Sequence, residues 1–403
     1  MKKQIDCSQI KGANYTPSYA RNDLEEWRDY DRETVERELG LAKRIGFNSI
    51  RTFLNYTVYE NDREKFLGNL LHLVRTADSL GMKVMPAVFD SCFSEIEPKI
   101  DLELNEWIPN PGVMNLSPAF WRKGEEYCRD LIDLLKSENG LLMWDVMNEP
   151  LCTAYVGRYS PEVNEAHKQE IYAFLKHFCD FFRGNDEVNP ITVGHAWVGS
   201  TEETQEWEDI LSYHDYSATE AGMKKTLSWA LELGKKYGKQ MFCSEAGCPG
   251  RANPYDAVIQ LENENRTGYF LWELMIGRSF WNDRHGIVYT DGTIRDPSII
   301  AAVSGFFRRR ENRTPYNANI EGQAGRVVSR IEDWLSSDRD PAVGLDVLNH
   351  AANLLESNQL VPECDLPSSY YEDMKKNGAD ADGIAAKLGE WLPVLKADIE
   401  RQR

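Results

Sequence analysis

Short apolar runs alternate with longer amphipathic stretches along the chain from Ile10 to about Arg310. A strand buried in a parallel sheet reads as a short apolar run, and a helix that covers such a sheet repeats its apolar positions every three to four residues. This alternation is typical of βα units. The runs that predict strands are Ile10–Asn14, Ser49–Phe53, Lys83–Phe89, Leu141–Met147, Ile191–His195, Ile210–Tyr213, Gln240–Cys243 and Gly268–Leu274. The helical patterns between them cover Thr34–Ile45, Arg63–Leu80, Phe120–Ser137, Glu162–Phe182 and Lys224–Tyr237.

Eight predicted strands, with helical segments between them, favour an α/β fold of the (β/α)8 TIM-barrel type over an open doubly wound sheet. The first predicted strand ends in Ala13-Asn14-Tyr15, without the glycine-rich turn that opens a Rossmann fold. This excludes a dinucleotide-binding fingerprint at that place, and no cofactor is expected. We predict a catalytic barrel over residues 1–310.

The pattern changes beyond residue 310, where the sequence contains no strand-like runs and no cluster of catalytic residue types. Helical periodicity predicts an α-helical C-terminal extension over residues 311–403. Its role stays open between a cap on the barrel and a surface for forming a homo-oligomer. The predicted helices are Gly325–Leu335, Pro341–Leu355 and Asp380–Arg403, with Ser357–Asn377 as a looser connection.

The net charge and the cysteine content indicate which binding partners and which cellular compartment to expect. The net charge is −19, which disfavours binding to nucleic acid or to an anionic membrane surface, because both are themselves negatively charged. No apolar run approaches the roughly 20 residues that a membrane-spanning helix needs, and no apolar segment of a secretory signal follows the basic start. The eight cysteines are sparse and form no C-x2-C pair. We therefore expect reduced thiols, a cytoplasmic location and no metal site.

Two predicted connections are much longer than the others. Ser91–Pro118 follows the third strand, and Met275–Asp296 follows the eighth. In a TIM barrel the loops after the strands lie at the carboxyl-terminal face, where these proteins build their pockets. We expect both connections to border a binding site.

Two glutamates stand at the ends of predicted strands on opposite sides of that face. Glu149 follows the fourth strand and Glu245 follows the seventh, each after an apolar run. A carboxylate in such surroundings is costly unless it is paired or has a chemical task. Glycoside hydrolysis is the chemistry that uses two facing carboxylates, one as a proton donor and one as a nucleophile or base. Aromatic residues that offer flat faces to a sugar ring are Trp197, Tyr216, Trp272 and Trp281.

The strand ends carry further residues in an order that resembles a known family. Asn148-Glu149-Pro150 ends strand four, Arg51 lies on strand two, His214-x-Tyr216 lies on strand six, and Trp272 lies on strand eight. With Glu245 on strand seven, this set resembles the clan A retaining glycoside hydrolases, and most closely glycoside hydrolase family 5, over roughly residues 8–310.

The resemblance implies that Glu149 is the general acid/base and Glu245 the nucleophile. Arg51 and Tyr216 would keep Glu245 ionised, and the neighbouring charge of Glu245 would raise the pKa of Glu149. Anomeric configuration would be retained, which requires the two carboxyl groups to lie about 5–5.5 Å apart. From its position on strand four we also expect Asp145 to form a structural ion pair with Arg51.

The same resemblance implies how the remaining residues meet a sugar. Asn148 would hydrogen-bond the 2-hydroxyl, His214 would orient the acid/base or touch the sugar, and Trp272 would form the floor of the −1 subsite. Many family members carry a histidine near the end of strand three. This chain departs from them with Val88-Phe89-Asp90-Ser91-Cys92, where we expect Asp90 to bond sugar hydroxyls instead.

Several substrates are compatible with these residues. The whole chain resembles intracellular family 5 β-mannosidases of gut bacteria, which implies exo-action on a short oligosaccharide such as mannosyl-β-1,4-N-acetylglucosamine. A β-glucosidase and an endo-β-1,4-glucanase or mannanase of the same family are alternatives. From other classes, a non-catalytic carbohydrate-binding barrel stays open. A metal-dependent barrel hydrolase is disfavoured because Gly12-Ala13-Asn14 on strand one offers no His-x-His.

Overall fold

The computed structural model describes residues 2–153, 156–281, 284–305, 320–357, 360, 366–378 and 380–402. The chain divides into two compact units, Met1–Arg308 and Arg309–Arg403. The boundary predicted between residues 310 and 311 lies outside the described residues. Within the described residues, no helix is long and apolar enough to cross a membrane.

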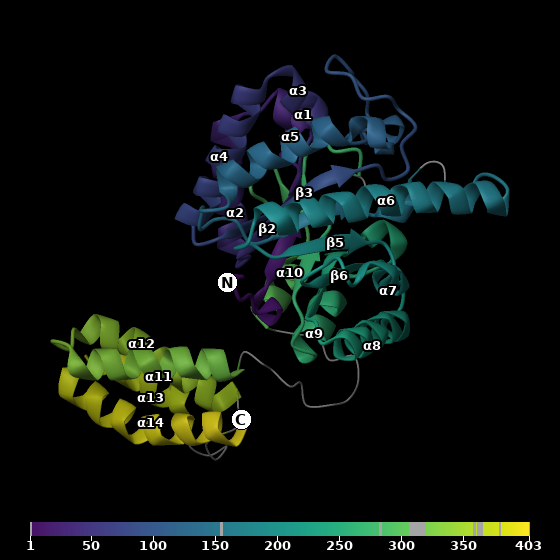
Figure 1. Cartoon of the computed structure of the whole chain (residues 1–403). Helices are drawn as coiled ribbons and strands as arrows, with labels where there is room; N and C mark the ends of the chain where they lie inside the picture. The colour runs from purple at the N-terminus through teal and green to yellow at the C-terminus, as the bar shows by residue number, and fades with distance from the viewer. Residues whose placement is uncertain are drawn as a thin grey trace. The chain divides into compact units, whose positions relative to one another are not determined.

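The first unit contains a closed barrel of eight parallel strands in chain order, with β8 pairing back to β1. Figure 1 shows the strands of this unit surrounded by helices. This confirms the predicted (β/α)8 fold. Each parallel pair requires a crossover, and the helices between the strands supply it. The barrel strands are β1 (Lys11–Asn14), β2 (Ser49–Phe53), β3 (Lys83–Asp90), β4 (Trp144–Asn148), β5 (Ile191–His195), β6 (Leu211–Asp215), β7 (Met241–Ala246) and β8 (Tyr269–Leu271).

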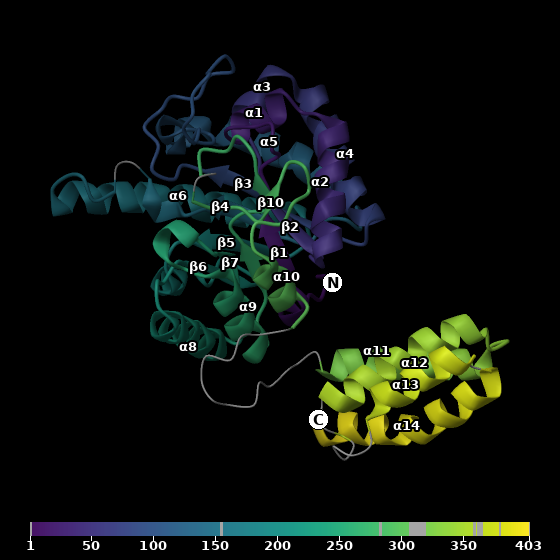
Figure 2. The same cartoon turned by 180° about the vertical axis from the view of Figure 1, so that it is seen from behind.

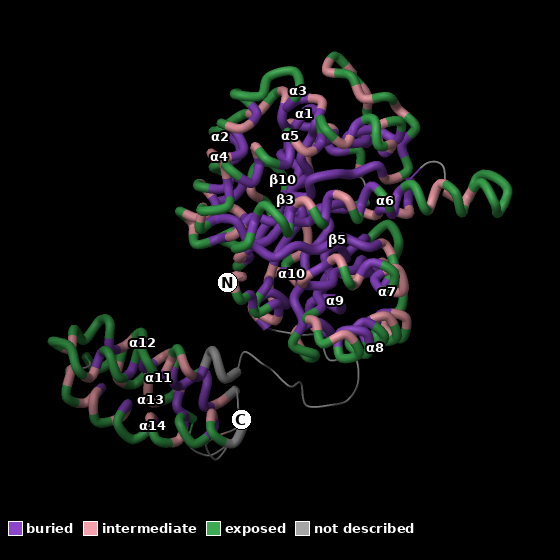
Figure 3. Tube along the Cα trace, in the orientation of Figure 1, coloured by how far each residue is buried: buried purple, intermediate pink, exposed green. Residues whose placement is uncertain are grey.

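Helices surround the barrel and bury their apolar faces against the outer side of the strands, so that the tube in Figure 3 is buried along the strands and exposed on the outer helix faces. Their ends follow the expected signals: Gly46 ends α2 in the left-handed conformation, and Pro118 opens α5 after Ser117. The helices are α1 (Asp23–Arg28), α2 (Arg32–Ile45), α3 (Tyr56–Asn61), α4 (Arg63–Ser79), α5 (Pro118–Leu135), α6 (Pro161–Asn185), α7 (Thr201–Thr204), α8 (Glu220–Tyr237), α9 (Tyr255–Glu264) and α10 (Pro297–Val303).

The inside of the barrel is filled by side chains near the amino ends of the strands. Met85, Met143, Phe242 and Phe270 pack there as one buried cluster. Gly12 on β1 is required beside it, because a Cβ atom at this position would lie 2.3 Å from the Phe270 ring. A different and more polar set of side chains occupies the carboxyl ends.

Several element boundaries differ from the sequence-based prediction. β4 begins at Trp144 rather than at residue 141, and β7 continues to Ala246, so Glu245 is part of the strand. β8 ends at Leu271, because beyond it the chain turns and the Leu274 amide donates to the carbonyl of Asn14. The last long connection also contains a two-stranded sheet that was not predicted, β9 (Met275–Ile276) and β10 (Val288–Tyr289).

The second unit is a bundle of helices, visible from behind in Figure 2. The prediction of a loose connection over residues 357–377 was wrong, because α13 lies within it. Its Tyr370, Tyr371 and Met374 pack against the core of the bundle. The rest of this helix is mostly polar, so its sequence shows little helical periodicity of apolar residues. The helices are α11 (Ile320–Ser336), α12 (Pro341–Ser357), α13 (Pro367–Asn377) and α14 (Ala381–Gln402).

Leu388→Ala tests whether this bundle has a hydrophobic core of its own. Leu388 on α14 is fully buried among Ile331, Leu348 and Trp391, so its truncation leaves a cavity. We expect a loss of about 2–5 kcal/mol in the unfolding free energy of the helical unit. The loss is measured by denaturant unfolding followed by Trp fluorescence and circular dichroism.

The matched control is Val343→Ala on the neighbouring helix, where the side chain is 50% exposed. Its effect should stay within about 0.5 kcal/mol. Equal losses in the two variants would contradict the described core.

Candidate active site

A cavity of about 1040 Å³ opens at the carboxyl ends of the barrel strands. Side chains at or just beyond the carboxyl ends of β2 to β8 line it. Both long connections border it as predicted, the first through residues 92–96 and 105–107 and the second through Phe280, Trp281 and His285. Concave sites of this size, with a mixed aromatic and polar lining, bind small organic ligands.

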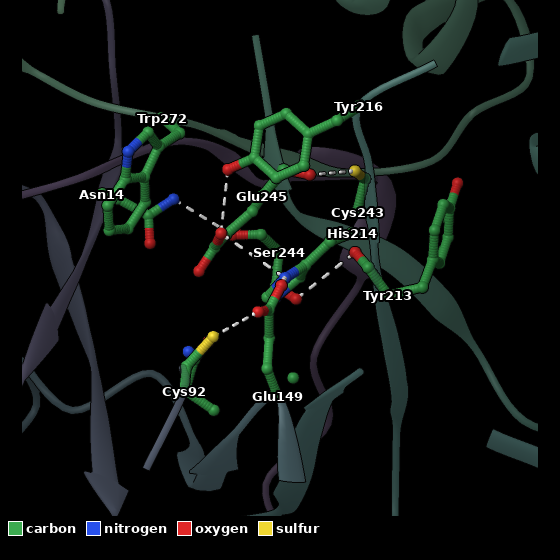
Figure 4. A network of polar contacts seen from close by, with 12 residues as sticks. Asn14, Cys92, Glu149, Tyr213, His214, Tyr216, Cys243, Ser244, Glu245 and Trp272 are labelled. Carbon is green, nitrogen blue, oxygen red and sulfur yellow. Dashed lines mark hydrogen bonds and ion pairs between the residues drawn. The ribbon is translucent and has the colours of Figure 1, made fainter. Parts of the chain in front are cut away.

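Glu149 enters the cavity from the residue directly after β4. Its backbone is left-handed, with φ 40° and ψ 56°, which is uncommon for a residue with a side chain. Its Oε1 lies 2.6 Å from Nδ1 of His214, and its Oε2 accepts a hydrogen bond of 2.8 Å from the Cys92 thiol (Figure 4). The unusual backbone turns this carboxylate away from the barrel helices and toward β6.

Glu245 faces Glu149 from within β7 and is nearly buried. Its Oε1 accepts from Nη1 of Arg51 at 2.6 Å, and its Oε2 accepts from the Tyr216 hydroxyl at 2.9 Å. Nδ1 of His214 is 3.4 Å from the same Oε2. The imidazole therefore lies between the two carboxylates, and one oxygen of each lies within 4.8 Å of the other and of His214.

Arg51 is fully buried and joins four strands through its guanidinium. Besides Glu245, it donates to Asp145 Oδ2 at 2.8 Å, Asn14 Oδ1 at 2.9 Å and Asn148 Oδ1 at 2.7 Å. The predicted ion pair of Arg51 with Asp145 is confirmed. Burial by itself disfavours the charged guanidinium, but the two carboxylates outweigh it and raise the pKa of Arg51.

The expected rise in the pKa of Glu149 was wrong for this structure. Burial acts to raise it, but the hydrogen bond and the charge of His214, with the thiols of Cys92 and Cys152, hold the pKa of Glu149 well below its usual range. Glu149 is consequently ionised here.

Asp90 and Asn148 form a second polar group beside Glu149. Asn148 Nδ2 donates to Asp90 Oδ1 at 3.3 Å, and Asp90 also accepts from Trp107 Nε1 at 2.6 Å and from the Cys92 amide at 2.9 Å. Burial raises the pKa of Asp90 to about 7. Both oxygens of Asp90 already accept hydrogen bonds from the protein, although the side chain lines the cavity as expected.

The aromatic residues predicted from the sequence also reach the cavity. Trp272 lies at its base with its ring edge-on to Phe53 and Trp107, while Trp197 is 57% exposed at the rim. The predicted site residues that line the cavity are Asp90, Asn148, Glu149, Trp197, His214, Tyr216, Glu245, Trp272 and Trp281.

The prediction that Arg51 binds substrate differs from the place where the structure puts this residue. Its side chain is fully buried and is not among the described residues that line the cavity, so it acts on Glu245 and Asn148 from below.

Sequence reasoning missed several residues of the lining. Cys92 and Cys152 flank Glu149, and the only signal for them was their position just after a predicted strand end and three residues after Glu149. Among the described residues, two groups have a spacing suited to a metal ion: Cys92, Glu149 and Cys152, and Glu149, His214 and Glu245. Other missed lining residues are Phe53, Trp107, Trp229, Arg251, Phe280 and His285.

Comparison with solved structures finds proteins of similar fold at low sequence identity. The exo-β-1,4-mannosidase Op5Man5 from Opitutaceae bacterium strain TAV5 is 16% identical, with a TM-score of 0.58 over 80% of this chain and 68% of that one. A GH5_18 protein from Streptomyces cattleya, solved with GlcNAc, is 18% identical, with a TM-score of 0.53 over 76% of this chain and 82% of that one.

A GH5_18 variant from Bifidobacterium longum subsp. longum, solved with Manβ1-4GlcNAc, is 16% identical, with a TM-score of 0.52 over 73% of this chain and 77% of that one. No curated protein matches. A sequence model of the cellulase family, glycosyl hydrolase family 5, matches residues 12–277. This range begins within β1 and contains β2 to β8 and both facing glutamates, and the chain therefore belongs to glycosyl hydrolase family 5.

Proposed function

We propose that this family 5 glycosidase is a retaining exo-β-mannosidase that cleaves short oligosaccharides such as mannosyl-β-1,4-N-acetylglucosamine. The observation that carries the retaining mechanism is the short distance between Glu149 and Glu245. One carboxylate oxygen of each lies within 4.8 Å of the other, and both lie within 4.8 Å of a ring nitrogen of His214. Inverting glycosidases hold their carboxyl groups about 6.5–9.5 Å apart to admit a water molecule, and retaining ones about 5–5.5 Å apart.

Glu245 is the nucleophile in this proposal. The ion pair with Arg51 and the hydrogen bond from Tyr216 favour its carboxylate form. Glu245 attacks the anomeric carbon, a glycosyl–ester bond forms, and the bond to the leaving oxygen breaks. Glu245 loses its negative charge when the ester forms. Arg51 still has Asp145 as a buried counter-charge, so its cation is not left unpaired.

Glu149 handles the proton for both half-reactions. Glu149 takes up a proton before the first half-reaction and passes it to the leaving oxygen as that oxygen gains charge. The short contact with His214 orients the Glu149 carboxyl group for this transfer. In the second half-reaction the Glu149 carboxylate takes a proton from water, and the resulting hydroxyl displaces Glu245 from the sugar. Retention follows, because the anomeric carbon is inverted twice.

The neighbouring residues would orient the sugar. Asn148 is held by Arg51 and Asp90, which leaves its amide rigid for a contact with the 2-hydroxyl. Trp272 offers an apolar face at the base of the cavity. The volume of about 1040 Å³ leaves room for a disaccharide, and the solved structures of similar fold include an exo-mannosidase and complexes with GlcNAc and Manβ1-4GlcNAc.

Other expectations from the sequence stay predictions. They are the cytoplasmic location, the absence of nucleic-acid and membrane partners, and a homo-oligomeric state. The seven cysteines of the described residues are all free thiols, as a reducing compartment would require.

A substrate panel tests the sugar specificity and the stereochemistry together. We expect faster hydrolysis of 4-nitrophenyl β-mannoside than of the β-glucoside, and cleavage of mannosyl-β-1,4-N-acetylglucosamine to mannose. NMR should show β-mannose as the first product, because double displacement retains configuration. Preference for the glucoside would contradict the mannosidase proposal alone, and initial α-mannose would contradict the retaining mechanism.

Paired variants with azide test which glutamate has which role. Glu149→Ala should lose about 10²–10⁴-fold in rate on substrates whose leaving group needs protonation, and much less on activated aryl glycosides. Azide should restore turnover and yield the β-glycosyl azide, because it attacks the glycosyl-enzyme. Glu245→Ala should instead yield the α-glycosyl azide by direct displacement. NMR identifies the anomer of each azide product. An α-glycosyl azide from Glu149→Ala and a β-glycosyl azide from Glu245→Ala would mean that the two roles are exchanged.

A further inference from the structure

Two thiols lie beside the proposed acid/base, in a part of the cavity that the hydrolysis mechanism does not use. Cys92 follows β3, and Cys152 ends the short 3-10 helix η3 (Pro150–Cys152) directly after Glu149. The Phe93 amide donates to the carbonyl of Cys152 at 2.7 Å, which holds the two segments side by side. Both cysteines line the cavity, and Figure 4 shows the Cys92 thiol directed at Glu149.

The spacing of these groups suits a small metal ion. The sulfur atoms of Cys92 and Cys152 and a carboxylate oxygen of Glu149 all lie within 4.8 Å of one another. A tetrahedral ion bound at about 2.0–2.3 Å from each ligand keeps its ligands about 3.3–3.8 Å apart, so small side-chain rotations would close the site. Water from the cavity can fill the fourth position.

The donor types select the kind of ion. Two sulfur ligands with one carboxylate favour the zinc class of thiophilic divalent cations, whereas Mg²⁺ and Ca²⁺ prefer sites made entirely of oxygen. The alternative group of Glu149, His214 and Glu245 is less suitable, because the Arg51 guanidinium lies 2.6 Å from Glu245 and repels a second cation there. On the thiol side, the described residue that hydrogen-bonds Glu149 Oε2 is Cys92, which is itself a ligand of this group.

We propose that Cys92, Cys152 and Glu149 form an inhibitory site for a thiophilic divalent cation such as Zn²⁺. Binding releases the two thiol protons to solvent and places the ion on the Glu149 carboxylate. An ion there prevents Glu149 from carrying a proton and occupies the space of the leaving oxygen, so the cation and the substrate exclude one another. The inhibition rests on the proposed function, whereas the binding of the ion does not.

Cadmium titration tests the binding without any measurement of hydrolysis. With the whole chain kept reduced by a phosphine, one equivalent of Cd²⁺ should produce the ultraviolet charge-transfer absorption of cadmium–thiolate bonds. Cys92→Ala and Cys152→Ala should each lose about half of the absorption, and the double variant should lose all of it. Each variant is first checked for native circular dichroism, and the single variants suffice if the double variant does not fold.

Cys248→Ala is the matched control. Its buried thiol lies 3.3 Å from His285, which lines the same cavity, but it is not part of either potential metal group. The absorption should be unchanged in this variant. Absence of the band in the wild type, or its persistence without Cys92 and Cys152, would overturn the site.

Inhibition is measured with the best aryl glycoside of the substrate panel. Zn²⁺ should inhibit competitively and Mg²⁺ at the same concentration should not. The inhibition constant for Zn²⁺ should weaken by at least about tenfold in Cys92→Ala. Cadmium absorption without Zn²⁺ inhibition would overturn the inhibitory role alone, and a chain that binds cadmium but hydrolyses no glycoside would refute the proposed function and leave the metal site standing.

Discussion

The arrangement of the catalytic end depends on one buried cation, the guanidinium of Arg51. It bonds Asn14 on β1, Asp145 and Asn148 on β4 and Glu245 on β7, and none of its side chain is exposed. A buried charge that loses its partner costs about 3–5 kcal/mol, so these strands must meet in one register for the barrel to close without penalty. The same contacts that satisfy the cation hold the Glu245 carboxylate and the Asn148 amide in place. Stability and chemistry at this face therefore have a common physical origin.

The two facing glutamates differ because their neighbours differ. Glu245 meets a permanent cation and a phenol, whereas Glu149 meets an imidazole and two thiols, groups that can bind a soft ion. This asymmetry suits one carboxylate to stay ionised and the other to exchange a proton. It also explains why the sequence-based expectation for the pKa of Glu149 was wrong: that expectation considered the charge of Glu245 and did not include the lowering effect of the hydrogen bond and charge of His214.

Much of the fold could be predicted from local pattern. The runs at Ser49–Phe53 and Ile191–His195 correspond to β2 and β5 at both ends, and every position of both strands is buried. The prediction failed where partners outside the segment decide the outcome. β8 stops early because the chain turns to bond β1, β9 and β10 are too short to show a period, and α13 is helical because the bundle core receives its few apolar residues. Every predicted site residue lines the cavity except Arg51, which is buried beneath the lining residues.

The sequence by itself determined which residues stand at the carboxyl ends of the strands, since strand order and spacing in a closed parallel barrel bring those ends to one face. It thereby determined the facing pair Glu149 and Glu245 and the aromatic lining around them. Only the tertiary structure decided which groups share hydrogen bonds with each carboxylate, and it placed Cys92 and Cys152 beside Glu149. The physical reason is range: the hydrophobic period is local along the chain, whereas charge compensation and hydrogen bonding depend on ångström distances between residues that lie about sixty to two hundred positions apart.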